Sequence, residues 1–319
     1  MDALSDVLRV VRLTGGVFLD ARFTAPWSLQ GKVEPIDFAP FLAAPRDVIG
    51  FHYVVEGRLI AQVEGGPSTE LQQGEIILLP RNAVHVLASS LDLEPYPAKD
   101  VVTQPPGAGI YQVKYGGGGE ETHIVCGYLG TDSVDNPLMA ALPPMLTLNV
   151  ADTPGGAWIA QSFAYAAQQL ATPEAGAATI IGKLSELMFV EAVRRYIEAL
   201  PPQECGWLAG LRDPAVGRAL ALMHTKPAHA WTAEELASTV NTSRSSFAER
   251  FTTLLGMPPM RYLTNWRMHL AATKLRDTRQ TIAQIAYEVG YESEAAFTRA
   301  FRREMGHPPA AWRKHVLAA

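Results

Sequence analysis

Cysteine is nearly absent from this sequence of 319 residues, which contains only Cys126 and Cys205. Two cysteines so far apart in the chain build neither a disulfide framework nor a zinc module made of cysteines. Their scarcity favours a reducing compartment, and the first ten residues lack the basic start and apolar core of a secretory signal peptide. We therefore expect a cytoplasmic protein.

Long apolar runs are missing as well. The longest stretch without a charged residue runs from Thr153 to Pro173 and contains glycine, glutamine and proline, which hydrocarbon tolerates poorly. This predicts no membrane-spanning helix and no membrane partner. Hydrophobic residues make up 48% of the chain and charged residues 18%, a balance typical of globular proteins, and the length favours two domains over one.

Basic residues are in the minority before residue 213. That part of the chain has 13 basic and 23 acidic residues, whereas the part from Asp213 onward has 14 basic and 9 acidic residues, so the net charges are −10 and +5. Such asymmetry is expected when one half of a protein meets a polyanion. Charge alone makes nucleic acid only a candidate partner of the C-terminal part.

An internal repeat occupies the last hundred residues. Thr232–Val240 aligns with Thr281–Val289, and two phenylalanines and a Gly-x-Pro-Pro sequence follow in both copies. Each copy predicts two short helices around a tight turn. The turns are expected at Asn241 and at Gly290, because these residue types adopt a positive φ most readily.

The residues after each turn predict where the helices begin and end. Ser243 and Ser293 are expected to cap the second helix of each copy. Between the copies, Pro259 to Thr278 predicts one long helix, and ~20 residues of α-helix span ~30 Å. Recognition helices that enter successive major grooves on one face of DNA lie ~34 Å apart. The length of the spacer fits this requirement.

The exposed face of each second helix carries small, polar and cationic side chains, which suit base edges and phosphates. The predicted DNA-contacting residues are Arg244, Ser245, Ser246, Glu249, Arg250, Glu294, Ala295, Thr298, Arg299, Arg302 and Arg303. The alternative is a pair of helical hairpins that serve packing only.

Residues 213–319 resemble the DNA-binding domain of the AraC/XylS family of bacterial transcription regulators. The residues that carry the resemblance are Ile285–Ser293, Phe297–Phe301 and Gly306–Arg313. The resemblance implies an all-α domain with two helix-turn-helix units and double-stranded promoter or operator DNA as a partner. It also implies RNA polymerase as a partner if the protein is an activator, and it places Arg299 where the family often has a base-contacting arginine.

Glu249 departs from the family pattern, in which many members carry a basic or neutral polar residue at this position. Its carboxylate could accept a hydrogen bond from the exocyclic amine of cytosine, or it could repel phosphate. The contribution of the first recognition helix is therefore open.

The N-terminal half predicts β structure. Phe51–Val55, Leu59–Val63 and Ile76–Leu79 are β-prone runs separated by glycines, a spacing typical of an antiparallel barrel or sandwich. Gly74–His85 resembles the second cupin motif and Tyr53–Gly57 resembles the end of the first. Many AraC-like regulators carry such a barrel as their effector domain, so the resemblance extends over nearly the whole chain.

The usual metal ligands of a catalytic cupin are missing. Such a cupin would place a glutamate near position 50 and two histidines just before it, where this sequence has Gly50 and Ala43–Arg46. We therefore expect no enzymatic activity. The alternative is a cupin-type enzyme fused to a DNA-binding domain.

Other side chains of this half are candidates for sensing. His52, His85 and Cys126 are the predicted effector-binding residues. His52, His85 and His123 could instead hold zinc or another divalent metal, although hydrogen-bonded pocket-lining histidines are the simpler interpretation. Strand alternation places Cys126 and His123 on opposite faces, and Cys126 is either a redox sensor or a small buried hydrophobe.

The predicted fold class is α+β with several domains. Residues 1–150 form a cupin-like, effector-sensing antiparallel β-barrel, residues 151–212 a helical dimerisation and linker segment, and residues 213–319 the double helix-turn-helix domain. From Ala157 to Leu200 the pattern is helical with a wide apolar stripe. The resemblance implies a homodimer formed through this region, and a small molecule, a metal or a redox change as the effector.

Overall fold

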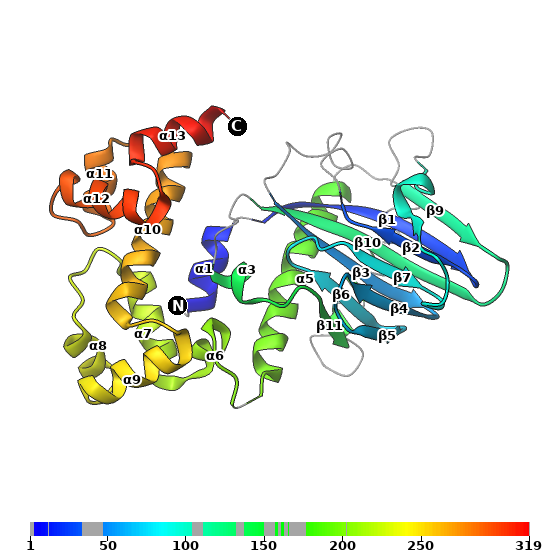
Figure 1. Cartoon of the computed structure of the whole chain (residues 1–319), viewed down its shortest axis with the longest axis horizontal. Helices are drawn as coiled ribbons and strands as arrows, with labels where there is room; N and C mark the ends of the chain where they lie inside the picture. Colours follow the sequence, from blue (N-terminus) through cyan, green and yellow to red (C-terminus); the bar gives the residue numbers. More distant parts are fainter. Residues whose placement is uncertain are drawn as a thin grey trace. The chain divides into compact units, whose positions relative to one another are not determined.

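The computed structural model describes most of the chain. The described residues are 3–11, 13–33, 47–103, 111–131, 137–149, 157–158, 161–162, 165, 177–201 and 203–318. Ala43–Arg46 and most of the segment from 150 to 176 lie outside them. The chain divides into two compact units, one made of Arg12–Val134 and Leu142–Ala199, the other of Met1–Val11, Asp135–Ala141 and Leu200–Ala319. Each unit is visible in Figure 1.

The first of these units consists of two β-sheets. The six-stranded sheet has the order β11 (Leu146–Asn149), β6 (Glu75–Leu79), β3 (Asp47–Glu56), β10 (Glu121–Thr131), β1 (Thr14–Thr24) and β9 (Tyr111–Gly116). The five-stranded sheet has the order β5 (Ser68–Gln72), β4 (Arg58–Val63), β7 (His85–Ala88), β2 (Ser28–Gly31) and β8 (Tyr96–Pro97). The three strands expected from sequence are confirmed as parts of β3, β4 and β6.

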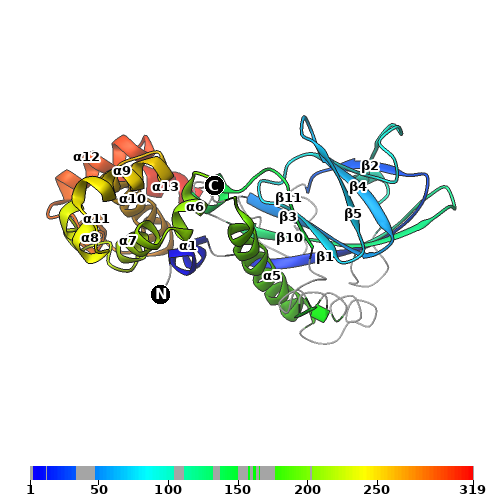
Figure 2. The same ribbon diagram turned by 90° about the horizontal axis from the view of Figure 1, so that it is seen from below.

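The two sheets share one apolar core. Leu59 and Leu87 of the five-stranded sheet pack in the same cluster as Phe23, Val54 and Ile124 of the six-stranded sheet. Figure 2 shows the sheets facing each other. Helix α5 (Ala177–Ala199) covers the six-stranded sheet, where it contacts β1, β10 and β11. The expected helical segment is thus confirmed over the described residues 177–199.

The second unit is helical. Its main elements are α6 (Trp207–Arg212), α7 (Pro214–Thr225), α8 (Ala233–Thr239), α9 (Arg244–Leu255), α10 (Pro259–Asp277), α11 (Ile282–Glu288), α12 (Glu294–Met305) and α13 (Pro309–Ala318). The pairs α8–α9 and α11–α12 are the two predicted helix-turn-helix units, joined by the predicted long helix α10. No helix in the described parts of the chain is long and apolar enough to cross a membrane.

The turns of both helix-turn-helix units have the expected local chemistry. Asn241 has a φ of 58° and Gly290 a φ of 88°. The Ser243 side chain accepts a hydrogen bond from the backbone N–H of Ser246, and Ser293 does the same for Ala296. These caps satisfy amides that would otherwise lack partners at the start of each second helix.

The domain boundaries differ from the expected ones. The stretch expected to link the domains contains α6, whose Trp207 is buried and donates a hydrogen bond from Nε1 to the Tyr262 hydroxyl at 2.8 Å. The N-terminal helix α1 (Ala3–Val11) belongs to the same unit, because its Val7 is fully buried and the helix packs on α7. The helical unit therefore begins at Leu200 and recruits the N-terminal residues. The ends of this unit therefore do not coincide with the expected domain boundaries at residues 150 and 212.

Candidate functional site

The predicted DNA-contacting residues all lie on α9 and α12, the second helices of the two units. Each helix buries two phenylalanines, Phe247 and Phe251 in α9 and Phe297 and Phe301 in α12. The opposite faces carry the predicted contact residues, which are exposed apart from the partly buried Thr298. The amphipathic pattern of each helix thus decides which side chains are available to a partner.

The cations of α9 are engaged within the protein. Arg244 Nη1 lies 2.8 Å from Glu234 Oε1 of α8, and Arg250 forms an ion pair with Asp213. The Asp213 carboxylate also accepts hydrogen bonds from the first backbone amides of α7. With Glu249 between these arginines, the exposed face of α9 has little uncompensated positive charge.

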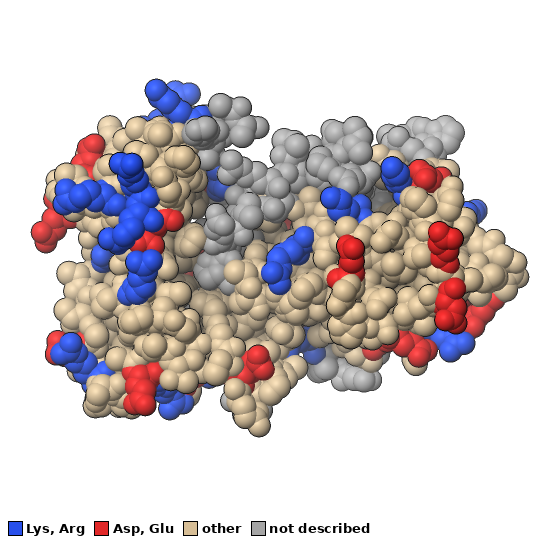
Figure 3. Space-filling view, in the orientation of Figure 1, with Lys and Arg blue, Asp and Glu red and all other residues tan. Residues whose placement is uncertain are grey.

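The cations of α12 are less engaged. The side chains of Arg299 and Arg302 make neither a hydrogen bond nor an ion pair to any other residue that the structure describes, and both residues are exposed. Arg303 pairs with Glu304, which also accepts a hydrogen bond from Arg261 of α10 at 2.8 Å. Figure 3 shows the Lys and Arg side chains gathered over the region of α10 to α12. Unpaired guanidinium groups of this kind suit phosphate and base contacts.

The two-sheet unit contains a cavity of about 550 Å³. Its wall is mainly apolar, formed by side chains such as Leu19, Phe23, Leu29, Leu87, Val113 and Ile124. The polar residues of its lining include Gln30, Lys32, His52, His85, Lys99 and Cys126. No acidic residue is among the described residues of the lining. An apolar cavity with a few polar groups is the usual form of a small-molecule site.

The two histidines of the cavity bond to each other. His52 Nε2 lies 2.9 Å from His85 Nε2, and His85 Nδ1 lies 2.9 Å from the carbonyl oxygen of Ala83. A carbonyl only accepts, so His85 Nδ1 carries the proton, and the neutral ring accepts a hydrogen bond at Nε2 from His52. His52 Nδ1 is then a buried acceptor, and it has no hydrogen-bond partner in the described structure.

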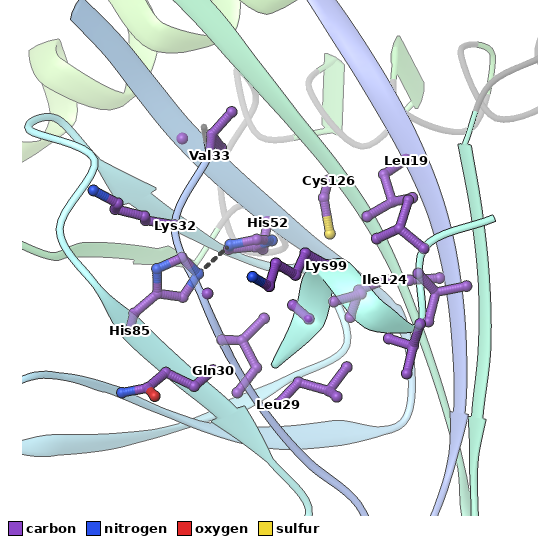
Figure 4. Close-up of a pocket in the computed structure, with 18 of the residues that line it drawn as sticks. Leu19, Leu29, Gln30, Lys32, Val33, His52, His85, Lys99, Ile124 and Cys126 are labelled. Atoms are coloured by element: carbon purple, nitrogen blue, oxygen red, sulfur yellow. Dashed lines mark hydrogen bonds between the residues drawn. The ribbon is translucent and has the colours of Figure 1, made fainter. Parts of the chain in front are cut away.

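Burial keeps both imidazoles neutral. It lowers the pKa of His52 well below its ordinary value, and the neighbouring charge of a protonated His85 would lower it further. Burial also lowers the pKa of His85, although its bond to Ala83 opposes this effect. Figure 4 shows the two rings pointing toward each other, with Cys126 pointing into the same cavity.

The structure separates His123 from this pair. Cys126 of β10 lies opposite His52 of β3 and shares its face, whereas His123 makes a hydrogen bond to Asp20. That bond lowers the pKa of the Asp20 carboxyl. The predicted set of His52, His85 and His123 as ligands of one metal is therefore wrong, because alternation along β10 sends His123 to the other face.

The residues present do not fit a cupin metal. Two imidazoles that hydrogen-bond to each other supply at most two ligands, and no group of three His, Cys, Asp or Glu side chains in the described structure could hold a metal ion. Gly50 occupies the position of the usual glutamate. Cys126 adds no thiolate, because burial raises the pKa of its thiol, an effect that the charge of Asp20 increases.

Lys32 and Lys99 were not recognised in the sequence. Both line the cavity and both are exposed to solvent. Lys99 lies in the short 3₁₀ helix Ala98–Asp100 and Lys32 follows β2, outside any motif or periodic pattern. Only the fold brings them to the cavity, so no signal in the sequence distinguishes them from other surface lysines.

Comparisons with known proteins cover both units. The family described as "Cupin" matches residues 2–198, and the family described as "Helix-turn-helix domain" matches residues 236–315. A "Putative AraC-like transcription regulator" of Streptomyces lividans is 33% identical over 99% of both chains. The "HTH-type transcriptional regulator AlkR" of Acinetobacter baylyi is 26% identical over 98% of this chain and 99% of its own. The DNA-binding domain of AdpA, solved in complex with a target DNA, covers 33% of this chain and 95% of its own, with 29% identity and a TM-score of 0.32.

Proposed function

Because the chain belongs to the family of AraC-like transcription regulators, we propose that it binds operator DNA with α9 and α12 and that a small molecule in the cavity of its cupin domain controls this binding. The observation that carries the DNA contact is the unpaired state of Arg299 and Arg302 on the exposed face of α12. Arg299 contacts a base edge, whereas Arg302 and Arg303 contact phosphates. The α9 residues Arg244, Ser245, Ser246 and Arg250 make a second, weaker set of contacts.

The cavity favours an apolar organic effector that carries one acidic or hydrogen-bonding group. Its wall is mainly apolar, and its described lining has two lysines and no carboxylate. His52, His85 and Cys126 lie among these groups, and the unpartnered Nδ1 of His52 is available to a donor after a small rearrangement of the pair. An effector that binds the DNA-competent arrangement more tightly than the other shifts the population toward it.

Metal sensing and redox sensing fit the same residues less well. A metal at the histidine pair has no third ligand in the described structure. A raised thiol pKa keeps Cys126 protonated, and a protonated thiol reacts slowly with oxidants. The missing cupin ligands also argue against catalysis, and an enzyme would show turnover that is lost when His85 is replaced.

We further infer a cytoplasmic homodimer that uses the exposed face of α5. Ile180 and Leu187 lie two helical turns apart on that helix and are 43% and 51% exposed. Large apolar side chains repeated on one exposed helix face are typical of contacts between proteins. RNA polymerase is an additional partner if the protein activates transcription.

The test combines selected DNA with a defined probe. Full-length protein first selects duplexes from a random library, and the affinity for the enriched duplex is then measured with and without 1-anilinonaphthalene-8-sulfonate, an apolar anion. The proposal predicts saturable binding of the probe and a change in DNA affinity. Binding of the probe that leaves DNA affinity unchanged would remove the cavity from the regulatory mechanism.

A further inference from the structure

Helix α10 carries a side chain that contacts parts of both helix-turn-helix units. Arg267 Nε donates a hydrogen bond to the carbonyl oxygen of Pro227 at 2.7 Å, and Nη2 donates one to that of His229 at 2.8 Å. Both acceptors lie in the loop 226–232, which leads into α8. The guanidinium group thus holds the loop that begins the first unit.

The same guanidinium group also reaches the second unit. Its carbon Cζ lies 6.0 Å from the centroid of the Tyr291 ring, within the range of a cation–π contact. Tyr291 follows Gly290, the turn residue between α11 and α12. Arg267 therefore lies between the loop of the first unit and the turn of the second.

Gly290 allows these two segments to approach closely. A Cβ atom built at this residue would lie 2.8 Å from the carbonyl oxygen of Ala228 and 2.9 Å from Nη2 of Arg267. Its φ of 88° is also one that other residues rarely adopt. The turn of the second unit thus packs directly on the loop of the first, and Arg267 closes this contact.

We propose that Arg267 is a positioning residue that fixes the separation and rotation of α9 relative to α12, so that the protein selects operators by the spacing between their half-sites. This inference rests on the DNA-binding function proposed above. One extra base pair moves a half-site by ~3.4 Å and rotates it by ~34°. A clamped pair of recognition helices cannot follow that displacement, whereas a pair joined by α10 alone can follow part of it.

An arginine is required at position 267 because one planar guanidinium group makes three separate contacts. Nε and Nη2 donate to two carbonyl oxygens, and Cζ of the same group lies over an aromatic ring. A lysine ammonium carries all its donors on a single nitrogen, which cannot occupy the positions of both Nε and Nη2. Arg267→Lys therefore behaves like Arg267→Ala in spacing selectivity.

The test measures affinity against half-site spacing. Full-length wild-type protein, Arg267→Ala and Arg267→Lys are titrated by fluorescence anisotropy on duplexes whose selected half-sites are moved by −2 to +2 base pairs. Wild-type affinity falls about tenfold or more for each displaced site. In both variants this penalty shrinks to about threefold or less. The salt slope of binding stays the same, because Arg267 contacts no phosphate.

A matched control is available in α13. Arg313 also donates to two carbonyl oxygens, those of Leu275 and Gln280, but both lie within or beside the second unit. Arg313→Ala keeps the spacing penalty of the wild type. A spacing profile unchanged in the Arg267 variants, or a salt slope reduced by about one, would overturn the proposal in favour of a packing role or a phosphate contact.

A second variant covers the case in which Arg267→Ala does not fold. Tyr291→Leu keeps an apolar side chain at the turn and removes the aromatic ring over which the guanidinium lies. This variant is expected to reduce the spacing penalty, as the Arg267 variants do. An unchanged penalty would count against the proposed positioning role of Arg267. If the wild-type protein selects no DNA at all, the proposed function fails and the spacing proposal fails with it. A selected DNA with a flat wild-type spacing profile overturns the spacing proposal alone.

Discussion

His52 of β3 and His85 of β7 join the two sheets of the cupin domain through a hydrogen bond of 2.9 Å between their Nε2 atoms. The bond needs at least one unprotonated Nε2 atom as the acceptor, so it is lost when both rings are protonated. The sheets are thus connected at the cavity by a bond that depends on pH.

The first prediction concerns stability against pH. The folded protein keeps both rings neutral, whereas the unfolded chain protonates them with an ordinary pKa of about 6.5. The unfolded state therefore binds more protons than the folded state as the pH falls below about 7. The free energy of unfolding decreases on acidification, until the pH reaches the pKa values of the two histidines in the folded state. Thermal melts between pH 7.5 and 5.5 should show a falling Tm.

The control for that prediction is a histidine outside the cavity. His52→Gln/His85→Gln should weaken the dependence of Tm on pH over this interval, whereas His123→Gln should retain most of it. An equal pH dependence in the wild type and the double variant would show that the pair does not control acid stability.

The second prediction separates base contacts from phosphate contacts. Arg302→Ala should weaken binding to all sequences alike and reduce the salt slope by about one, whereas Arg299→Ala should relax the preference at one base position. Binding to a randomised library, sequenced before and after selection, distinguishes the two effects. Arg244→Ala is the matched control, since Arg244 already pairs with Glu234 on the surface and should contribute less.

The third prediction concerns the lysines of the cavity. Lys99→Ala and Lys32→Ala should each lower the affinity for 1-anilinonaphthalene-8-sulfonate by about threefold to tenfold, because they remove a positive charge from the lining. Lys114→Ala removes an exposed lysine of β9 that is absent from the lining and should change nothing. Titration of the probe fluorescence gives the dissociation constants. Equal losses in all three variants would indicate binding elsewhere.

The fourth prediction follows from the position of α6 in the helical unit. The Tyr262 hydroxyl accepts a hydrogen bond from Trp207 Nε1 and lies 2.8 Å from His224 Nε2. Tyr262→Phe leaves both nitrogens buried without this partner and should lower the free energy of unfolding by about 1–3 kcal/mol. Denaturant unfolding measures the loss. Thr264→Val, at an exposed hydroxyl on the same helix, should cost less than half as much.

The local chemistry of the helical unit was predictable from sequence. The turns at Asn241 and Gly290 and the caps at Ser243 and Ser293 depend on residues only a few positions apart, so the sequence contains the necessary information. Strand alternation likewise placed His123 and Cys126 on opposite faces of β10 correctly. Each of these expectations rests on short-range geometry.

Other features required the fold. The burial of Trp207 and the recruitment of α1 are contacts between distant parts of the chain, which no local pattern reports. The ion pair of Arg250 with Asp213 is of the same kind, and it removes a cation that the sequence presents as free. The spacing of histidines in the sequence likewise could not show that only two of the three meet.

The most direct test of the account is the sequence selected by the full-length protein from a random DNA library. We expect an enriched site in which each protomer contacts one pair of half-sites, centred about 10–10.5 base pairs apart, one for α9 and one for α12. An enriched site that contains a single half-site, or no enrichment over the starting library, would contradict it.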